Sequence, residues 1–113
     1  MVKKQIQSFR DLKIWAMGIE LVKEIYQLTK LFPHEELYGL TSQLRRAAVS
    51  VPSNIAEGHI RGHKAEFRQF LFIALGSLAE LETQLIISGE LGYVTAVMYK
   101  NIINKNRYIG KDD

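Results

Sequence analysis

The chain has 113 residues, enough for one hydrophobic core and too few for two. Its composition, with 47% hydrophobic and 24% charged residues, is ordinary for a soluble globular domain, and the lack of cysteine excludes disulfides and cysteine metal sites from this sequence. The net charge of +3 is weak for a dedicated nucleic-acid binder, and the longest apolar run, residues 70–75, is too short for a bilayer span, so we expect a cytoplasmic protein without a membrane partner.

The first predicted helix covers about residues 9–32. Ser8 and Asp11 have the spacing of a capping box, with aspartate where Glu or Gln is usual. Two apolar stripes follow at three- and four-residue steps, one of Leu12, Trp15, Ile19, Val22 and Tyr26 and the other of Ile14, Leu21, Ile25 and Leu28. This is more apolar surface than one neighbouring helix covers, which favours a contact with a second subunit.

The second predicted helix covers about residues 35–57, and its two faces differ. Leu44, Ala48, Val51 and Ile55 form an apolar stripe, opposite a polar stripe of Gln43, Arg46, Ser50, Ser53 and Glu57. Pro52 lies inside the helical pattern, where proline costs about 3 kcal/mol and leaves the carbonyl four residues earlier, that of Ala48, without its donor. We predict a bend at Pro52, with the Asn54 amide as the replacement donor.

Residues 58–62 predict a turn, because Gly58 and Gly62 can both take positive φ angles. The third predicted helix follows at about residues 63–88, and its apolar seam repeats in steps of four and three: Phe67, Leu71, Ala74, Leu78, Leu81 and Leu85. Further apolar residues lie off this seam, so the helix is apolar around much of its circumference. Gly76 and Ala79 are small enough to let another helix approach closely.

The fourth predicted helix covers about residues 95–109, after a loop closed by Gly89 and Gly92, with Thr95 as its cap. Its apolar stripe is sparse, and three asparagines make it a poor helix former. The pattern as a whole predicts one all-α domain over residues 1–113, an antiparallel up-down-up-down four-helix bundle with a short fourth helix.

Three segments of the chain resemble a known family. They are Phe9 to Leu12 with Trp15, residues 43–58, and residues 67–93 around the core of residues 76–82. This pattern is similar to the small four-helix-bundle proteins encoded in intervening sequences of bacterial 23S rRNA genes, which are related to the accessory protein of diversity-generating retroelements. The resemblance covers roughly residues 8–93. It implies an all-helical subunit that assembles into a ring, a pentamer in that family, without an established catalytic activity, and it makes this chain short at its C-terminus.

Basic residues gather around the predicted turn. His59, Arg61, His63, Lys64 and Arg68 form a compact set that a ring would repeat as a positive rim. Such a rim would bind the phosphate backbone of RNA or DNA without reading bases, and its affinity would fall steeply with salt. The alternative is a solvated face that only aids solubility. The related retroelement protein, which contacts reverse transcriptase and nucleic acid, favours binding.

The polar stripe of the second helix also has two interpretations. Arg45 or Arg46 can meet Glu57 or another carboxylate across a subunit contact, because guanidinium groups suit desolvated carboxylates. Alternatively, the arginines face phosphate on a surface or pore. We favour the subunit contact, and assign Arg45, Arg46, Pro52, Asn54 and Glu57 structural or interface roles.

The sequence contains no recognisable constellation for catalysis or for binding a metal or cofactor. His59 and His63 are four residues apart, but the flanking glycines place them in a turn, so we expect no metal. We therefore expect a non-enzymatic homo-oligomer, with a pentamer favoured, that associates with nucleic acid. The alternative is a scaffold that binds a protein partner and no nucleic acid. The sequence does not identify that partner or the cellular process.

Overall fold

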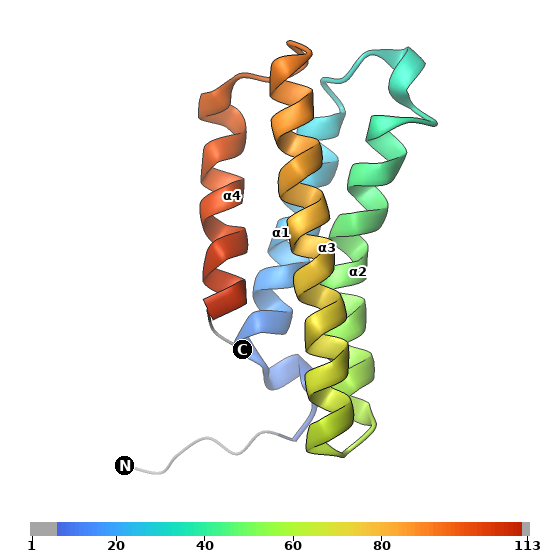
Figure 1. Cartoon of the computed structure of the whole chain (residues 1–113), viewed down its shortest axis with the longest axis vertical. Helices are drawn as coiled ribbons and strands as arrows, with labels where there is room; N and C mark the ends of the chain where they lie inside the picture. Colours follow the sequence, from blue (N-terminus) through green and yellow to red (C-terminus); the bar gives the residue numbers. More distant parts are fainter. Residues whose placement is uncertain (1–6, 112–113) are drawn as a thin grey trace.

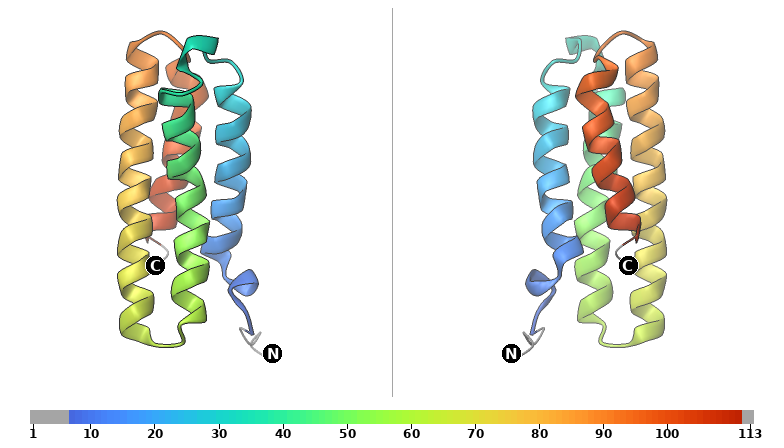
Figure 2. Two further views of the ribbon diagram at one scale, coloured as in Figure 1. Left: turned by 90° about the vertical axis from the view of Figure 1, so that its right-hand side faces the viewer. Right: turned by 90° about the vertical axis from the view of Figure 1, so that its left-hand side faces the viewer.

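The computed structural model describes residues 7–111 as an antiparallel bundle of four helices, with no strand in that range (Figure 1). The helices are α1 (Lys13–Thr29), α2 (Leu40–Ile60), α3 (Lys64–Glu90) and α4 (Ala96–Lys111), and two short 3-10 helices, η1 (Phe9–Asp11) and η2 (His34–Glu36), precede α1 and α2. The bundle measures 48 × 29 × 18 Å, and α2 lies between α1 and α3 (Figure 2). The predicted all-α four-helix bundle is confirmed.

The predicted capping box is present, but it caps a 3-10 turn. The Ser8 hydroxyl accepts the Arg10 N–H at 3.1 Å, and the Asp11 carboxylate accepts the Ser8 N–H at 3.2 Å. Leu12 is extended, with φ −77° and ψ 127°, so η1 and α1 are separate elements. The prediction of one continuous helix from residue 9 was therefore wrong. This interruption at Leu12 lets the Phe9 ring pack edge-on against the Trp15 ring, with the ring centroids 5.4 Å apart.

The bounds of α2 differ from the prediction at both ends. Its start is delayed to Leu40 because η2 and Gly39 intervene, and a Cβ at Gly39 would lie 2.6 Å from the Glu36 carboxylate. At the other end, Gly58 is not in a turn but inside the helix and buried, where a Cβ would lie 2.7 Å from that of Phe70. Of the two glycines predicted to take positive φ, only Gly62 does, at 76°. Gly58 therefore serves close packing of α2 against α3.

The core follows the predicted stripes of α2 and α3. Leu44, Ala48, Val51 and Ile55 are all 0% exposed, and the α3 seam is buried from Ala74 to Leu85. On α1 the second stripe, which includes Leu21 and Ile25, enters the core, whereas the first is half-buried or, at Tyr26, exposed. Pro52 is buried against α1, since a Cβ at Gly18 would lie 3.1 Å from the proline Cβ.

The shorter helix α4 covers only part of α3. It is capped as predicted by Thr95, whose hydroxyl accepts the Met98 N–H at 3.4 Å. Asn106 on α4 is buried, and neither atom of its amide has a hydrogen-bond partner, which weakens the packing of this helix. By length and composition alone α3 could cross a membrane, and only 28% of its most apolar stretch is buried in the bundle. Much of the apolar surface of α3 is therefore exposed.

Candidate functional site

The five residues predicted to bind nucleic acid lie at one end of the molecule, around the α2–α3 turn (Figure 1). We call His59, Arg61, His63, Lys64 and Arg68 the basic end. Within it, Arg61 lies 3.7 Å from the Glu57 carboxylate and 3.6 Å from that of Glu66, and its guanidinium stacks over the Phe70 ring. The two carboxylates offset part of the positive charge of Arg61, Lys64 and Arg68. The basic end and its two acidic neighbours together carry a fixed charge close to neutral.

The other members of the basic end are placed differently. His63, Lys64 and Arg68 are exposed, whereas His59 is half-buried with its ring 6.0 Å from that of Phe67. Only the exposed side chains can reach a phosphate without rearrangement. The structure therefore brings the predicted set together but separates the exposed His63, Lys64 and Arg68 from Arg61, which is exposed but ion-paired, and from His59, which packs beside Phe67.

Arg45 of α2 is held against α1. Its Nε donates a hydrogen bond to the Thr29 hydroxyl at 2.9 Å, and its guanidinium lies 4.5 Å from the centre of the Tyr26 ring. Thr29 is itself buried and donates to the Ile25 carbonyl at 2.7 Å. Within residues 7–111 no carboxylate lies at ion-pair distance from Arg45. The side chain is fixed in direction, and its terminal nitrogens remain available to a partner.

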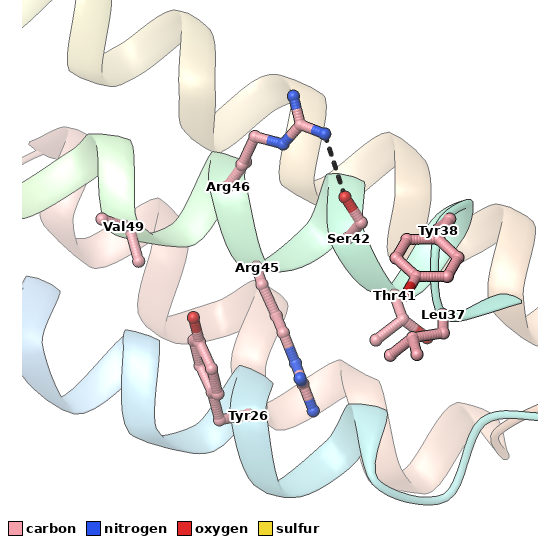
Figure 3. Close-up of a pocket in the computed structure, with 8 residues that line it drawn as sticks. All are labelled: Tyr26, Leu37, Tyr38, Thr41, Ser42, Arg45, Arg46 and Val49. Carbon is pink, nitrogen blue, oxygen red and sulfur yellow. Dashed lines mark hydrogen bonds between the residues drawn. The ribbon is translucent and has the colours of Figure 1, made fainter. Parts of the chain in front are cut away.

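A groove surrounds this arginine (Figure 3). Its volume is about 540 Å³, and its wall is mostly apolar. We call it the Arg45 groove, lined by Tyr26, Leu37, Tyr38, Thr41, Ser42, Arg45, Arg46 and Val49. Arg45 reaches toward α1, whereas Arg46 points to the other side of α2 and donates to the Ser42 hydroxyl at 3.0 Å. The two adjacent arginines therefore do not act as one cluster.

The polar stripe of α2 joins this helix to α3. The hydroxyls of Ser50 and Ser77 lie 2.8 Å apart in a hydrogen bond. The Asn54 amide donates to the Ser50 carbonyl at 2.8 Å and to its hydroxyl at 2.9 Å. The prediction that Asn54 compensates the Ala48 carbonyl was therefore wrong, because the side chain of Asn54 reaches back one turn only to Ser50. Glu57 pairs within the chain with Arg61, not with Arg45 or Arg46.

The structure also reveals a polar link between the two loops at the opposite end of the bundle from the basic end. The Glu36 carboxylate accepts the Leu40 N–H at 3.0 Å and the Tyr93 hydroxyl at 2.8 Å. The Leu40 amide, followed by the Tyr93 hydroxyl, lowers the pKa of Glu36, and the same carboxylate raises the pKa of Tyr93. The sequence placed negative charge near the start of α2, but it held no signal for a tyrosine partner 57 residues away.

The outward side of α3 forms a second apolar surface. We call it the outer face of α3, made of the exposed residues Phe72, Gly76, Ala79, Thr83, Ile86, Ile87 and Glu90. The Phe72 side chain is 64% exposed, and a Cβ at Gly76 would meet no atom within 4 Å. Nothing in the described part of the chain requires glycine or these large apolar side chains at those positions. They favour a contact outside the single subunit.

Metal-binding geometry is not found in the described part of the chain. Within residues 7–111 no group of three or more His, Asp or Glu side chains is placed to hold a metal ion. His59 lies in the last turn of α2, whereas His63 is the N-cap residue of α3, so the two do not share one helix. The absence of enzymatic activity and of a cofactor stays a prediction from the sequence.

The family model for 23S rRNA-intervening sequence proteins matches residues 10–112. The chain belongs to this family. Among solved structures, a protein of unknown function of the S23 ribosomal protein family from Bacteroides thetaiotaomicron has a similar fold, with 27% sequence identity and a TM-score of 0.79. The similarity covers 87% of this chain and 92% of that one. No match was found among curated proteins.

The family match confirms the resemblance to the 23S rRNA-intervening sequence proteins, and it extends almost to the end of the chain. The relation to the retroelement accessory protein stays a prediction. The similar structure belongs to a protein of unknown function, so it indicates no activity or partner. The comparisons therefore establish the family and the fold.

Proposed function

We propose that this 23S rRNA-intervening sequence protein is a non-enzymatic homo-oligomeric scaffold, with a pentamer favoured, which associates with nucleic acid without reading its sequence. The observation that carries the oligomer is the outer face of α3, where large apolar side chains are exposed beside small ones. Fully burying a side chain the size of Phe or Ile contributes roughly 1.5–3 kcal/mol, so covering several of them favours association. The pentamer itself rests on the family resemblance.

The native mass tests this proposal directly. Light scattering of the full chain over a range of protein concentrations should give a mass several times that of one subunit, and five times if the ring is a pentamer. A Phe72→Asp substitution should lower the mass, because it places a charge in the proposed contact. A monomer at all concentrations would contradict the proposal.

The basic end supports nucleic-acid association. Repetition around a ring would bring the exposed Lys64 and Arg68 of several subunits to one rim. Several weak phosphate contacts in one assembly give a higher overall affinity than any single contact. Because Arg61 is already paired with two carboxylates, we expect Lys64 and Arg68 to contribute more than Arg61. The attraction is electrostatic and independent of base sequence.

Fluorescence anisotropy with a labelled RNA and a labelled duplex DNA tests this surface. Binding should appear at low salt, weaken steeply as salt rises, and be lost in a Lys64→Glu/Arg68→Glu variant. Lys23→Glu/Lys30→Glu is the matched control, since it makes the same change in net charge away from the basic end. Lys23 lies in α1, and Lys30 directly follows that helix. Equal loss in both variants would indicate a general charge effect instead of a site.

The near neutrality of the basic end favours a second candidate function. In this alternative the oligomer binds a protein partner and no nucleic acid. An oligomer of the expected mass that binds neither RNA nor DNA at low salt would support the alternative. Binding that depends on Lys64 and Arg68 would exclude it.

A further inference from the structure

Arg45 is oriented toward a partner that the described chain does not supply. Its Nε donates to the Thr29 hydroxyl and one face of its guanidinium lies over the Tyr26 ring, which leaves its two terminal nitrogens to bind a partner. A planar guanidinium held in this way binds a carboxylate through two parallel hydrogen bonds. The walls of the groove are mostly apolar, with Leu37 and Val49 among the exposed side chains. A matching surface therefore combines one carboxylate with apolar side chains.

A phosphate backbone fits this groove less well than a carboxylate on a protein. Nucleic acid carries a charge at every nucleotide and is bound by several cations in a row. Arg46 also lines the Arg45 groove, but its side chain points away from that of Arg45 and bonds the Ser42 hydroxyl (Figure 3). Two arginines that diverge beside apolar side chains resemble the centre of a protein interface, where arginine and aromatic side chains concentrate, more than a row of cations.

The outer face of α3 has the complementary composition. Residues 69–99 contain no lysine or arginine, and Glu90 follows Ile86 and Ile87 by about one helical turn. Glu90 is exposed, and no cation within residues 7–111 lies at ion-pair distance from its carboxylate. The face thus presents two isoleucines and one unpaired carboxylate together.

The two surfaces can run alongside each other when two subunits are placed with parallel axes. Ser50 contacts Ser77, and Gln43 lies beside Gln84, so each step along α2 corresponds to one step backwards along α3. By this register Arg45 is level with Glu82, and Ile86 is level with Thr41. Displacing the second copy along the axis by eight residues, about 12 Å, brings Glu90 level with Arg45 and Ile86 level with Val49, which lines the Arg45 groove.

We propose that the Arg45 groove of one subunit receives the end of the outer face of α3 from a second copy, with Glu90 of that copy paired to Arg45 and its Ile86 and Ile87 packed on the groove wall. This inference rests on the proposed homo-oligomer. The groove is formed by residues of α1, of α2 and of the segment before α2, whereas the outer face belongs to α3, and α2 lies between α1 and α3 (Figure 2). Such a contact joins two different patches, and when the rotation between copies closes it produces a ring.

A charge exchange tests the pairing. Arg45→Glu and Glu90→Arg should each weaken association by roughly tenfold or more, since each leaves like charges facing one another in the contact. The double variant, with both substitutions in one chain, should recover most of the loss, because the pair is restored in the opposite direction. Lys100→Glu, which reverses an exposed charge on α4 outside both surfaces, is the matched control and should change the native mass little. Circular dichroism and thermal unfolding verify that each variant folds.

Engineered cysteines provide a second test that does not depend on charge. Because the chain has no cysteine, one protein carrying Val49→Cys and another carrying Ile86→Cys supply the only thiols in a mixture of the two. Mild oxidation of the mixture should produce a disulfide-linked dimer of one protein of each kind on a non-reducing gel. Either protein oxidised alone should produce much less, because the contact joins unlike surfaces.

The outcomes separate this inference from the proposed function. A wild-type monomer would contradict both. An oligomer of the expected mass that is indifferent to the charge exchange, or that fails to form the mixed disulfide, would overturn only the pairing of the Arg45 groove with the outer face of α3. Recovery in the double variant together with the mixed disulfide would establish it.

Discussion

Arg45 and Arg61 are both arginines of the α2 region, at opposite ends of that helix, and they have opposite local environments. Arg61 lies between Glu57 and Glu66 at the basic end. Arg45 has no carboxylate near it in the described chain and is instead fixed by a buried hydroxyl and an aromatic ring. The comparison teaches that the number of basic residues in a segment does not identify its binding surface. The neighbours decide which charge is available.

The largest expected effect concerns the packing that forms the basic end. Gly58→Ala should destabilise the fold by about 1–3 kcal/mol, because the new Cβ would overlap Phe70. Gly76→Ala is the control on the exposed side of α3 and should stabilise the subunit by about 0.5–1 kcal/mol through helix propensity. Urea unfolding of both variants measures the difference. Equal stabilities would show that α2 and α3 can separate at this end without cost.

A smaller effect is expected at the buried support of Arg45. Thr29→Val removes the hydroxyl that accepts from Nε and should cost about 1–2 kcal/mol in unfolding free energy. Native mass should also decrease, because Arg45 loses its fixed direction. Thr83→Val changes an exposed threonine of α3, whose hydroxyl bonds only its own helix at the Ala79 carbonyl, and serves as the control for stability. A Thr29→Val protein with unchanged assembly would make the orientation of Arg45 unimportant.

The Glu36 link predicts a pH dependence of stability. The pKa of Glu36 is lowered in the folded state, mainly by the Leu40 amide and then by the Tyr93 hydroxyl. Its stabilisation is therefore complete above the ordinary glutamate pKa of about 4.3 and is lost as the pH falls through the lower pKa of the folded state. Glu36→Gln should flatten stability against pH in that acidic range, whereas Glu35→Gln should not. Thermal unfolding from pH 3 to 7 measures this.

The smallest effect on stability should come from releasing Arg61. Glu57→Gln/Glu66→Gln removes two partly exposed ion pairs, so unfolding free energy should change by less than about 1 kcal/mol. Nucleic-acid affinity at low salt should nevertheless rise, because the basic end gains two units of positive charge. Glu20→Gln/Glu35→Gln makes the same charge change elsewhere and is the control. An equal rise in both variants would show that only net charge matters.

Local patterns predicted the architecture well. The stripe from Leu44 to Ile55 is fully buried, and the cap at Thr95 and the capping box at Ser8 are both present. Errors arose where a distant neighbour overrides local preference. Gly58 was assigned to a turn because glycine can take positive φ, but it lies inside α2, where the close approach of Phe70 disfavours any larger residue. Similarly, the prediction treated Arg45 and Arg46 alike, although only Arg45 hydrogen-bonds to Thr29 of α1.

The sequence by itself determined the four helices, the faces they bury and the family, because apolar periodicity and capping depend on residues within a few positions of one another. Only the tertiary structure decided which charges are paired and which surfaces stay open. The partners of Arg45, Glu36 and Ser50 come from other helices or loops, and their contacts depend on how helices rotate and slide against one another. A one-residue change in register would replace each partner without altering the helical pattern, which is why the sequence could not specify them.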